Sequence, residues 1–130
     1  MEDAGIETAR DAFWRMIGNG RLHFQRCDGC NNAWLPPRED CPSCWSPEWR
    51  WEEASGRGKL VSWVVFHTAF HEAFETRLPY NVAVIELDEG PRLISNVVDL
   101  PDSGIDVADR PVSLTIETDH GRTLPRFKLA

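Results

Sequence analysis

The sequence has few positive charges and no cluster of them. Its 130 residues include 14 Lys and Arg against 21 Asp and Glu, a formal net charge of −7, and the acidic excess is spread along the chain. Binding to nucleic acid depends on several clustered Lys and Arg side chains that displace counterions, and docking on an anionic membrane surface also needs basic clusters. We therefore expect neither nucleic acid nor a membrane as a partner.

Long hydrophobic runs are also missing. No apolar run approaches the roughly 20 residues of a membrane-spanning helix, and the acidic start Met1-Glu2-Asp3 lacks the basic and apolar regions of a signal peptide. Apolar residues make up 42% and charged residues 27% of the chain, a balance typical of soluble globular proteins. We expect a folded cytoplasmic protein, with room for one small domain and a metal-stabilised module.

The common signatures of catalysis are absent too. The sequence contains no Gly-x-Ser-x-Gly elbow, no phosphate-binding loop and no dinucleotide glycine fingerprint. His71 with Glu72 or Glu75 could form an acid–base pair, but such neighbours are common on solvated turns. An autonomous enzyme built on His71 is therefore a weaker hypothesis than a binding module.

All four cysteines fall within 18 residues, as the pairs Cys27, Cys30 and Cys41, Cys44. Two Cys-x-x-Cys pairs joined by a short connector are typical of a tetrahedral Cys₄ metal site, and a reducing cytoplasm disfavours two disulfides. The ligand set favours zinc, although the spacing alone does not separate zinc from iron. Because four thiolates leave no position for water, we expect one structural metal ion per chain and no catalytic role for it.

Four tryptophans crowd the same segment, which has few aliphatic residues: Trp34, Trp45, Trp49 and Trp51. We expect their rings to cover the metal centre. An aromatic platform for nucleic-acid bases or for a partner is the alternative, and the scarcity of nearby basic residues disfavours bases.

A short helix is predicted over residues 8–17, ahead of the cysteines. Thr8 can cap it, with Asp11 three residues on, and the glycines at 18 and 20 stop it. A helix this short is marginal on its own, so it must dock on its own domain or on a partner, and the sequence leaves both open. The candidate partner contacts are Phe13, Trp14 and Ile17.

The pattern changes to strands after a glycine-rich joint at residues 55–58. Strands are predicted over residues 59–68, 80–87, 92–98, 111–118 and 123–129, with a connector at 100–110. Five short strands suit an OB-type barrel better than an immunoglobulin-like sandwich of about seven strands. We predict a mainly β chain: an N-terminal helix (1–20), a Cys₄ zinc ribbon (21–54) and a five-stranded OB-fold barrel (55–130).

The loop over residues 67–79 is too long for a hairpin turn. Loops of this length are usually functional or disordered, and this one carries Phe70, His71, Phe74 and Arg77. A flap that contacts a ligand or partner and simple packing over one end of the barrel both remain open. His67 and His71 are four residues apart, but a second metal site would need a third ligand.

Several motifs occur in one order along residues 10–128: Phe13-Trp14, Gln25-Arg26-Cys27, Pro36-Pro37-Arg38, Cys41-Pro42, Gly56-x-Gly58-x-Leu60, His67-x-Ala69-Phe70-His71, Pro79-Tyr80, the segment 86–92 and Leu124-Pro125-x-Phe127. In this order they closely resemble the acyl-CoA-associated family of rubredoxin-like zinc ribbon plus OB-fold proteins. The chain departs from the family at Asn31, where a glycine commonly follows the first pair of cysteines.

The resemblance implies an accessory subunit whose thiolase-fold or lipid-transfer-protein-type partner carries the catalytic residues of an acyl-CoA enzyme. The favoured reaction is retro-aldol cleavage of a β-hydroxyacyl-CoA such as a steroid side-chain thioester. Candidate contacts for the partner or for the anionic coenzyme A, at or near the interface, are Phe70, His71, Phe74, Arg77, Arg92, Arg126 and Lys128.

Two alternatives stay open beside the aldolase subunit. One is a scaffold or CoA-binding subunit of an acetyl-CoA acetyltransferase or hydroxymethylglutaryl-CoA synthase complex. The other, suggested by the barrel class alone, is a free-standing module that binds a lipid thioester or nucleic acid, the latter disfavoured by the missing basic groove.

Overall fold

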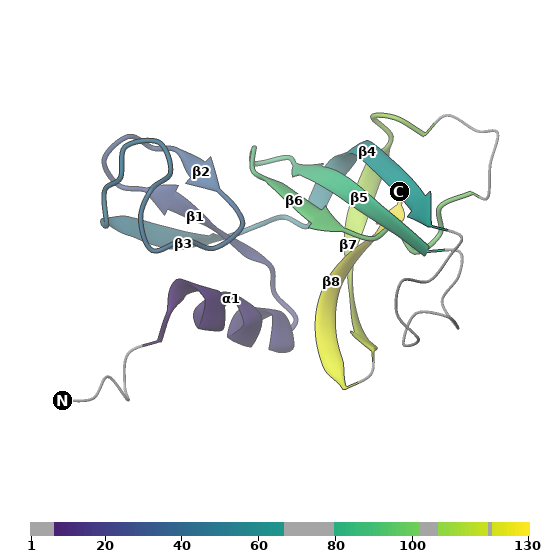
Figure 1. Cartoon of the computed structure of the whole chain (residues 1–130), viewed down its shortest axis with the longest axis horizontal. Helices are drawn as coiled ribbons and strands as arrows, with labels where there is room; N and C mark the ends of the chain where they lie inside the picture. Colours follow the sequence, from purple (N-terminus) through teal and green to yellow (C-terminus); the bar gives the residue numbers. More distant parts are fainter. Residues whose placement is uncertain (1–6, 67–79, 102–106, 120) are drawn as a thin grey trace.

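The computed structural model describes residues 7–66, 80–101, 107–119 and 121–130. One helix precedes two β-sheets (Figure 1). The elements are α1 (Ala9–Gly18), β1 (His23–Cys27), β2 (Ala33–Trp34), β3 (Trp49–Glu53), β4 (Arg57–Phe66), β5 (Tyr80–Leu87), β6 (Arg92–Ser95), β7 (Pro111–Asp119) and β8 (Arg122–Leu129). The predicted fold class, a mainly β chain with an N-terminal helix, a ribbon and an OB-type barrel, is confirmed.

The first sheet is small and has the order β2-β1-β3, with both strand pairs antiparallel. The second has the order β6-β5-β4-β7-β8, again antiparallel. It curls until the segment after β6 meets β8, where Val97 bridges to Phe127 and the Val98 amide donates to the Phe127 carbonyl at 2.8 Å. This contact brings the two ends of the sheet together, as an OB-type barrel requires.

Helix α1 begins and ends close to where its sequence predicts. The Asp11 amide donates to Oγ1 of Thr8 at 3.1 Å, which satisfies one of the free N–H groups of the first turn. A carboxylate of the ribbon adds a second tie, because the Ala9 amide donates to Oε2 of Glu39 at 2.7 Å. The N-terminus of α1 is thereby attached to the ribbon.

One hydrophobic core joins the helix, the ribbon and the barrel. Phe13 and Ile17 of α1 and Phe24 of β1 belong to the same buried cluster as Ile85 and Phe127 of the barrel. The helix therefore docks on its own chain. Figure 1 shows α1 beneath the ribbon sheet and beside β8.

The glycine-rich joint between the sheets has a steric reason. Gly56 has φ +87°, a conformation that strains other residues, and its carbonyl accepts from the Leu114 amide at 2.7 Å. A Cβ at Gly58 would collide with the backbone carbonyl of Glu86 on the adjacent strand β5. The two glycines therefore allow the chain to pass from β3 into β4 while its backbone lies close to β5 and β7.

The five observed barrel strands follow the predicted ones, and shifts of one to three residues occur at half of the strand ends. The largest difference is at β6, which stops at Ser95, three residues before the predicted end. The predicted flap at residues 67–79 lies outside the described residues. No helix in the described part of the chain has the length and apolar character needed to cross a membrane.

Candidate metal centre and adjoining groove

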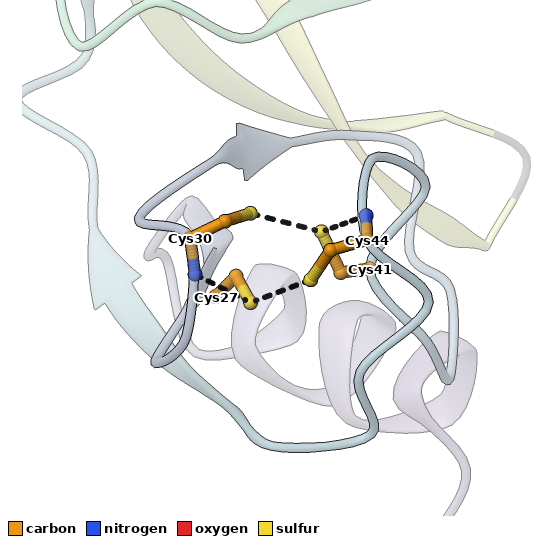
Figure 2. Close-up of side chains that lie close together, drawn as sticks. All are labelled: Cys27, Cys30, Cys41 and Cys44. Atoms are coloured by element: carbon orange, nitrogen blue, oxygen red, sulfur yellow. Dashed lines mark hydrogen bonds between the residues drawn. The ribbon is translucent and has the colours of Figure 1, made fainter.

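The four cysteines converge at one end of the ribbon (Figure 2). The Sγ atoms of Cys27 and Cys44 are 3.5 Å apart, those of Cys30 and Cys41 are 3.6 Å apart, and all four Sγ atoms lie within 4.8 Å of one another. Tetrahedral zinc with Zn–S bonds of about 2.3 Å requires sulfurs about 3.8 Å apart. The cluster has the composition and dimensions of a Cys₄ zinc site.

The two cysteine pairs form two equivalent turns. The Cys27 and Cys41 carbonyls accept from the amides of Asn31 and Trp45, at 3.1 and 2.8 Å. Asn31 and Trp45 both have φ of 66°, the left-handed conformation that completes each turn. Asn adopts this conformation readily, whereas a bulky residue such as Trp does so at a cost. This explains why Asn31 can stand where the family resemblance led us to expect a glycine.

Backbone amides aim at the two buried sulfurs. Cys27 Sγ accepts from the amides of Gly29 and Cys30 at 3.3 and 3.4 Å, and Cys41 Sγ accepts from those of Ser43 and Cys44 at 3.3 and 3.5 Å. Such donors stabilise thiolates, the form that binds metal. The turns therefore prepare both sulfurs for a cation.

The pKa values of Cys27 and Cys41 are lowered, which favours the thiolate form, whereas the pKa of Cys44 is raised. Desolvation raises the pKa of Cys41, but the amides of Cys44 and Ser43 and the adjacent thiols outweigh it and lower the pKa to about 6. The Cys30 amide makes the largest contribution to lowering the pKa of Cys27. The Ser46 amide lowers the pKa of Cys44, but its neighbours Cys27, Cys30 and Cys41, together with desolvation, raise it to about 12. Four crowded thiols cannot all ionise together unless a cation compensates them.

Ion pairs fasten the first turn to the ribbon sheet. Arg50 on β3 donates to Oδ1 of Asp28 at 2.7 Å and also pairs with Glu52, which accepts from Arg26 on β1 at 3.0 Å. When bound, the metal supplies a cross-link between the two turns. With four protein ligands it has no open position, so its role is structural.

The tryptophans cover the centre only in part. Trp34 is buried with Cys27 and Cys41, and Trp49 packs against this group, with its indole donating to the Glu39 carbonyl at 2.8 Å. Trp51 meets Trp49 edge to face and turns toward the main core. The expectation was wrong for Trp45, which is 67% exposed and lies under the Arg38 guanidinium.

A buried amide locks the loop that follows β2. Gln25 is 0% exposed, its Nε2 donates to the Arg38 carbonyl at 2.6 Å and its Oε1 accepts from the Arg38 amide at 2.9 Å. The side chain thus imitates a strand neighbour for residues 36–38. This contact joins two of the sequence motifs, Gln25-Arg26 and Pro36-Pro37-Arg38.

The locked loop forms one wall of an apolar groove of about 660 Å³. The opposite walls come from α1, β5, β6 and β8. Its described lining is apolar except for Arg10 and Arg92, and it includes Trp14, Leu35, Pro36, Pro37, Val84 and Ile94. Sequence reasoning missed this groove, although the uninterrupted apolar run at 82–85 was a signal that the outer face of β5 is apolar as well as its inner face.

The candidate helix contacts divide between core and surface. Phe13 and Ile17 are buried in the chain's own core, whereas Trp14 is 43% exposed at the groove and meets Phe13 edge to face. Contact of the helix with a partner stays a prediction, and it now depends on Trp14.

The described candidate cations lie on two strands, β6 and β8. Arg92 lies at the groove and donates to Oε1 of Glu86 at 2.9 Å. Arg126 on β8 is 18% exposed and donates to Glu117 at 3.1 Å, and Lys128 is exposed two residues further along. Four other candidates lie outside the described residues: Phe70, His71, Phe74 and Arg77.

A Cys₄ ribbon fused to an OB-type barrel defines the class of the protein, and comparisons with known sequences agree. Residues 14–50 match the family model of the ChsH2 rubredoxin-like zinc ribbon domain. Residues 51–116 match that of the ChsH2 C-terminal OB-fold domain. The chain belongs to the ChsH2 family, whose members also carry the name DUF35, and its four cysteines bind one structural zinc ion.

Similar proteins carry several names. A "probable enoyl-CoA hydratase alpha subunit" of Thermomonospora curvata is 40% identical over 121 residues, which are 92% of this chain but 37% of that protein. A "DUF35 domain-containing scaffold protein" of Methanothermobacter thermautotrophicus is 37% identical over 79% of this chain and 77% of its own length. A solved structure titled "Ltp2-ChsH2(DUF35) aldolase" has a chain that is 38% identical, with a TM-score of 0.80, covering 95% of this chain and 96% of that one.

Proposed function

We propose that the chain is a non-catalytic accessory subunit of an acyl-CoA aldolase, in which a thiolase-fold protein of the lipid-transfer type performs the reaction. One observation carries the proposal: the chain matches a chain of an Ltp2-ChsH2 aldolase over nearly the full length of both.

The described chemistry supports an accessory role. The cysteines are committed to a closed metal site. His23 is the one histidine among the described residues, and it lies on β1 of the ribbon, where burial lowers its pKa. The described residues show no nucleophile hydrogen-bonded to a base, the arrangement that covalent catalysis needs.

The finer proposal concerns the reaction. We favour cleavage of the carbon–carbon bond of a β-hydroxyacyl-CoA, such as a steroid side-chain thioester, with the proton-transfer groups on the partner. This chain would stabilise that partner and shape its acyl-CoA site. Arg92 is the candidate cation for the coenzyme that stands nearest to an apolar groove.

The test is an assay of three samples: this chain, purified Ltp2 and their mixture, each with a β-hydroxyacyl-CoA that carries a steroid side chain. We expect cleavage by the mixture and none by this chain alone. Activity of this chain without Ltp2 would show an autonomous enzyme. The accessory role would be contradicted if the mixture were neither more active nor more stable than Ltp2 alone.

A scaffold or CoA-binding subunit of an acetyl-CoA acetyltransferase or hydroxymethylglutaryl-CoA synthase complex is the second candidate. The archaeal relatives favour it, because they are named scaffold proteins. Gel filtration of this chain with each of the three enzymes distinguishes the two candidates. Co-elution with the acetyltransferase or the synthase, and not with Ltp2, would favour the scaffold.

A further inference from the structure

One row of side chains on the outer face of the barrel sheet is apolar where solvent would favour polar residues. Side chains alternate across a strand, and Ala83 and Ile85 of β5 point inward with 0% exposure. Their neighbours Val82 and Val84 therefore point outward, and they pair with Val64 of β4 and Ile94 of β6. Val64 is 54% exposed and Ile94 is 74% exposed.

This aliphatic row continues into the groove. Val84 and Ile94 belong to both, and on the far side of the groove the exposed Trp14 of α1 extends the apolar surface. We call the row, the groove and Trp14 the docking face. It is wider than a pocket for one small molecule, because Val64 and Val82 extend it along the outer face of the sheet beyond the groove lining. Contiguous exposed apolar surface of this kind marks interaction sites.

The charges at the docking face have the sign opposite to that of the chain. Both charged residues of the described groove lining are arginines, Arg10 and Arg92, on a chain of net charge −7. Arg10 makes no ion pair with any described residue. Arg92 shares the carboxylate of Glu86 with Lys59, at 2.9 and 3.8 Å, so this group keeps one positive charge in excess.

We propose that the docking face binds a different protein subunit, through an apolar surface of that subunit with carboxylates at its margin. The proposal rests on the accessory role proposed above and specifies where the partner sits. A second copy of this chain fits less well, because a two-fold contact would bring the same two arginines to both sides of the interface. Exposed aromatic and arginine side chains around an aliphatic centre are the composition expected of binding hot spots.

The test measures the affinity of Ltp2 for the full-length zinc-loaded chain and for Ile94→Asp, by isothermal titration calorimetry. Val98→Asp is the matched control, because Val98 is an aliphatic residue 46% exposed that does not line the groove. We expect Ile94→Asp and Trp14→Ala each to weaken binding at least about tenfold, with Val98→Asp unchanged. Both residues are exposed, so the variants should keep the wild-type circular dichroism.

Charge reversal provides a second readout. We expect Arg10→Glu to slow association several-fold at low salt and to lose that effect at high salt, because rim charges act mainly on the association rate. Arg21→Glu is the control, since Arg21 is exposed and outside the groove lining.

The outcomes separate the two proposals. Wild-type affinity of Ile94→Asp and Trp14→Ala for Ltp2 would overturn the docking face and leave the accessory role standing. No binding of the wild-type chain to Ltp2 would overturn the aldolase role together with this inference. A wild-type dimer in sedimentation that Ile94→Asp dissociates, or saturable binding of palmitoyl-CoA that Ile94→Asp abolishes, would assign the face to a second copy or to a small ligand and overturn the proposal.

Discussion

The ribbon and the barrel have interiors of different kinds. The buried group beside the metal centre consists of two cysteines and one tryptophan, with Trp49 packed against them. The barrel interior is aliphatic and aromatic, with Leu60, Ile85 and Phe127 each 0% exposed. An apolar core stabilises a domain through the area it removes from water, whereas a centre of crowded thiols needs a cation. The two halves should therefore fail under different treatments.

They resemble each other in how they hold their loops. Gln25 in the ribbon grips both backbone groups of Arg38. Asn81 in the barrel donates to the Val97 carbonyl and accepts from the Val97 amide, both at 2.8 Å. In each half a side-chain amide makes the two backbone hydrogen bonds that a neighbouring strand would otherwise make. An irregular segment is thereby held beside a regular sheet.

Removing the metal should produce the largest difference in stability between the ribbon and the barrel. Structural zinc contributes roughly 10–16 kcal/mol in small zinc-binding peptides, so chelation, or Cys41→Ser, should unfold residues 27–49. The amides of β4 to β8 should stay protected, although less so, because Phe13 and Phe24 belong to the shared core. Hydrogen exchange followed by mass spectrometry measures both regions.

Ser43→Ala is the control for the cysteine variant, because it keeps all four ligands and the Ser43 amide. Ribbon amides that remain protected in metal-free protein would contradict the view that the ribbon depends on its metal.

Truncation of Phe127 should destabilise the barrel and leave the metal centre of the ribbon intact. Phe127 lies at the closure of the barrel with no exposure, and Phe→Ala in a core typically costs about 3–5 kcal/mol. We expect Phe127→Ala to lower the free energy of unfolding in urea by that amount while zinc content stays at one per chain. Lys128→Ala, next to it and exposed, should change stability little. Loss of zinc from folded Phe127→Ala would show that the two halves are one unit.

Local patterns predicted most of the chain. The capping residue Thr8, the four cysteines and the strand at residues 80–87 carry signals of their own, and the structure has each where expected. The direction in which α1 docks could not be predicted, because Phe13 and Trp14 are adjacent and only the tertiary packing buries one and exposes the other.

The groove lay beyond sequence reasoning for a similar reason. Its walls come from segments far apart in the chain, including Trp14, Pro36 and Ile94. The position of Pro36 depends on the buried Gln25, and a glutamine two residues before a cysteine carries no sign that it will be buried. Trp45 was misjudged because its proximity to Cys44 in the sequence does not determine where its side chain lies, and it is 67% exposed.

The side-chain amides of Gln25 and Asn81, which each hold one loop, allow a direct comparison of the ribbon and the barrel. Removing either should have a smaller effect on stability than the changes above. Gln25→Leu removes both hydrogen bonds to the Arg38 backbone, and a typical intramolecular hydrogen bond contributes about 0.5–1.5 kcal/mol to stability. Asn81→Leu does the same to Val97. We expect Gln25→Leu to increase hydrogen exchange around residues 35–38 and Asn81→Leu around residues 96–98, as measured by mass spectrometry. Equal exchange in both loops for either variant would contradict independent locks.

The smallest expected effect is the pH dependence of stability that His23 gives the ribbon. Burial lowers the pKa of His23 below its usual 6.5, with opposition from the charge of Glu53. The unfolded chain therefore binds this proton more readily than the folded chain, so the stability present above pH 6.5 declines as pH falls toward the lower folded pKa. We expect wild-type protein to lose slightly more stability than His23→Gln between pH 7.5 and 5.5, by urea unfolding at matched zinc. Parallel pH profiles for the two proteins would show that His23 does not contribute to the acid sensitivity of the ribbon.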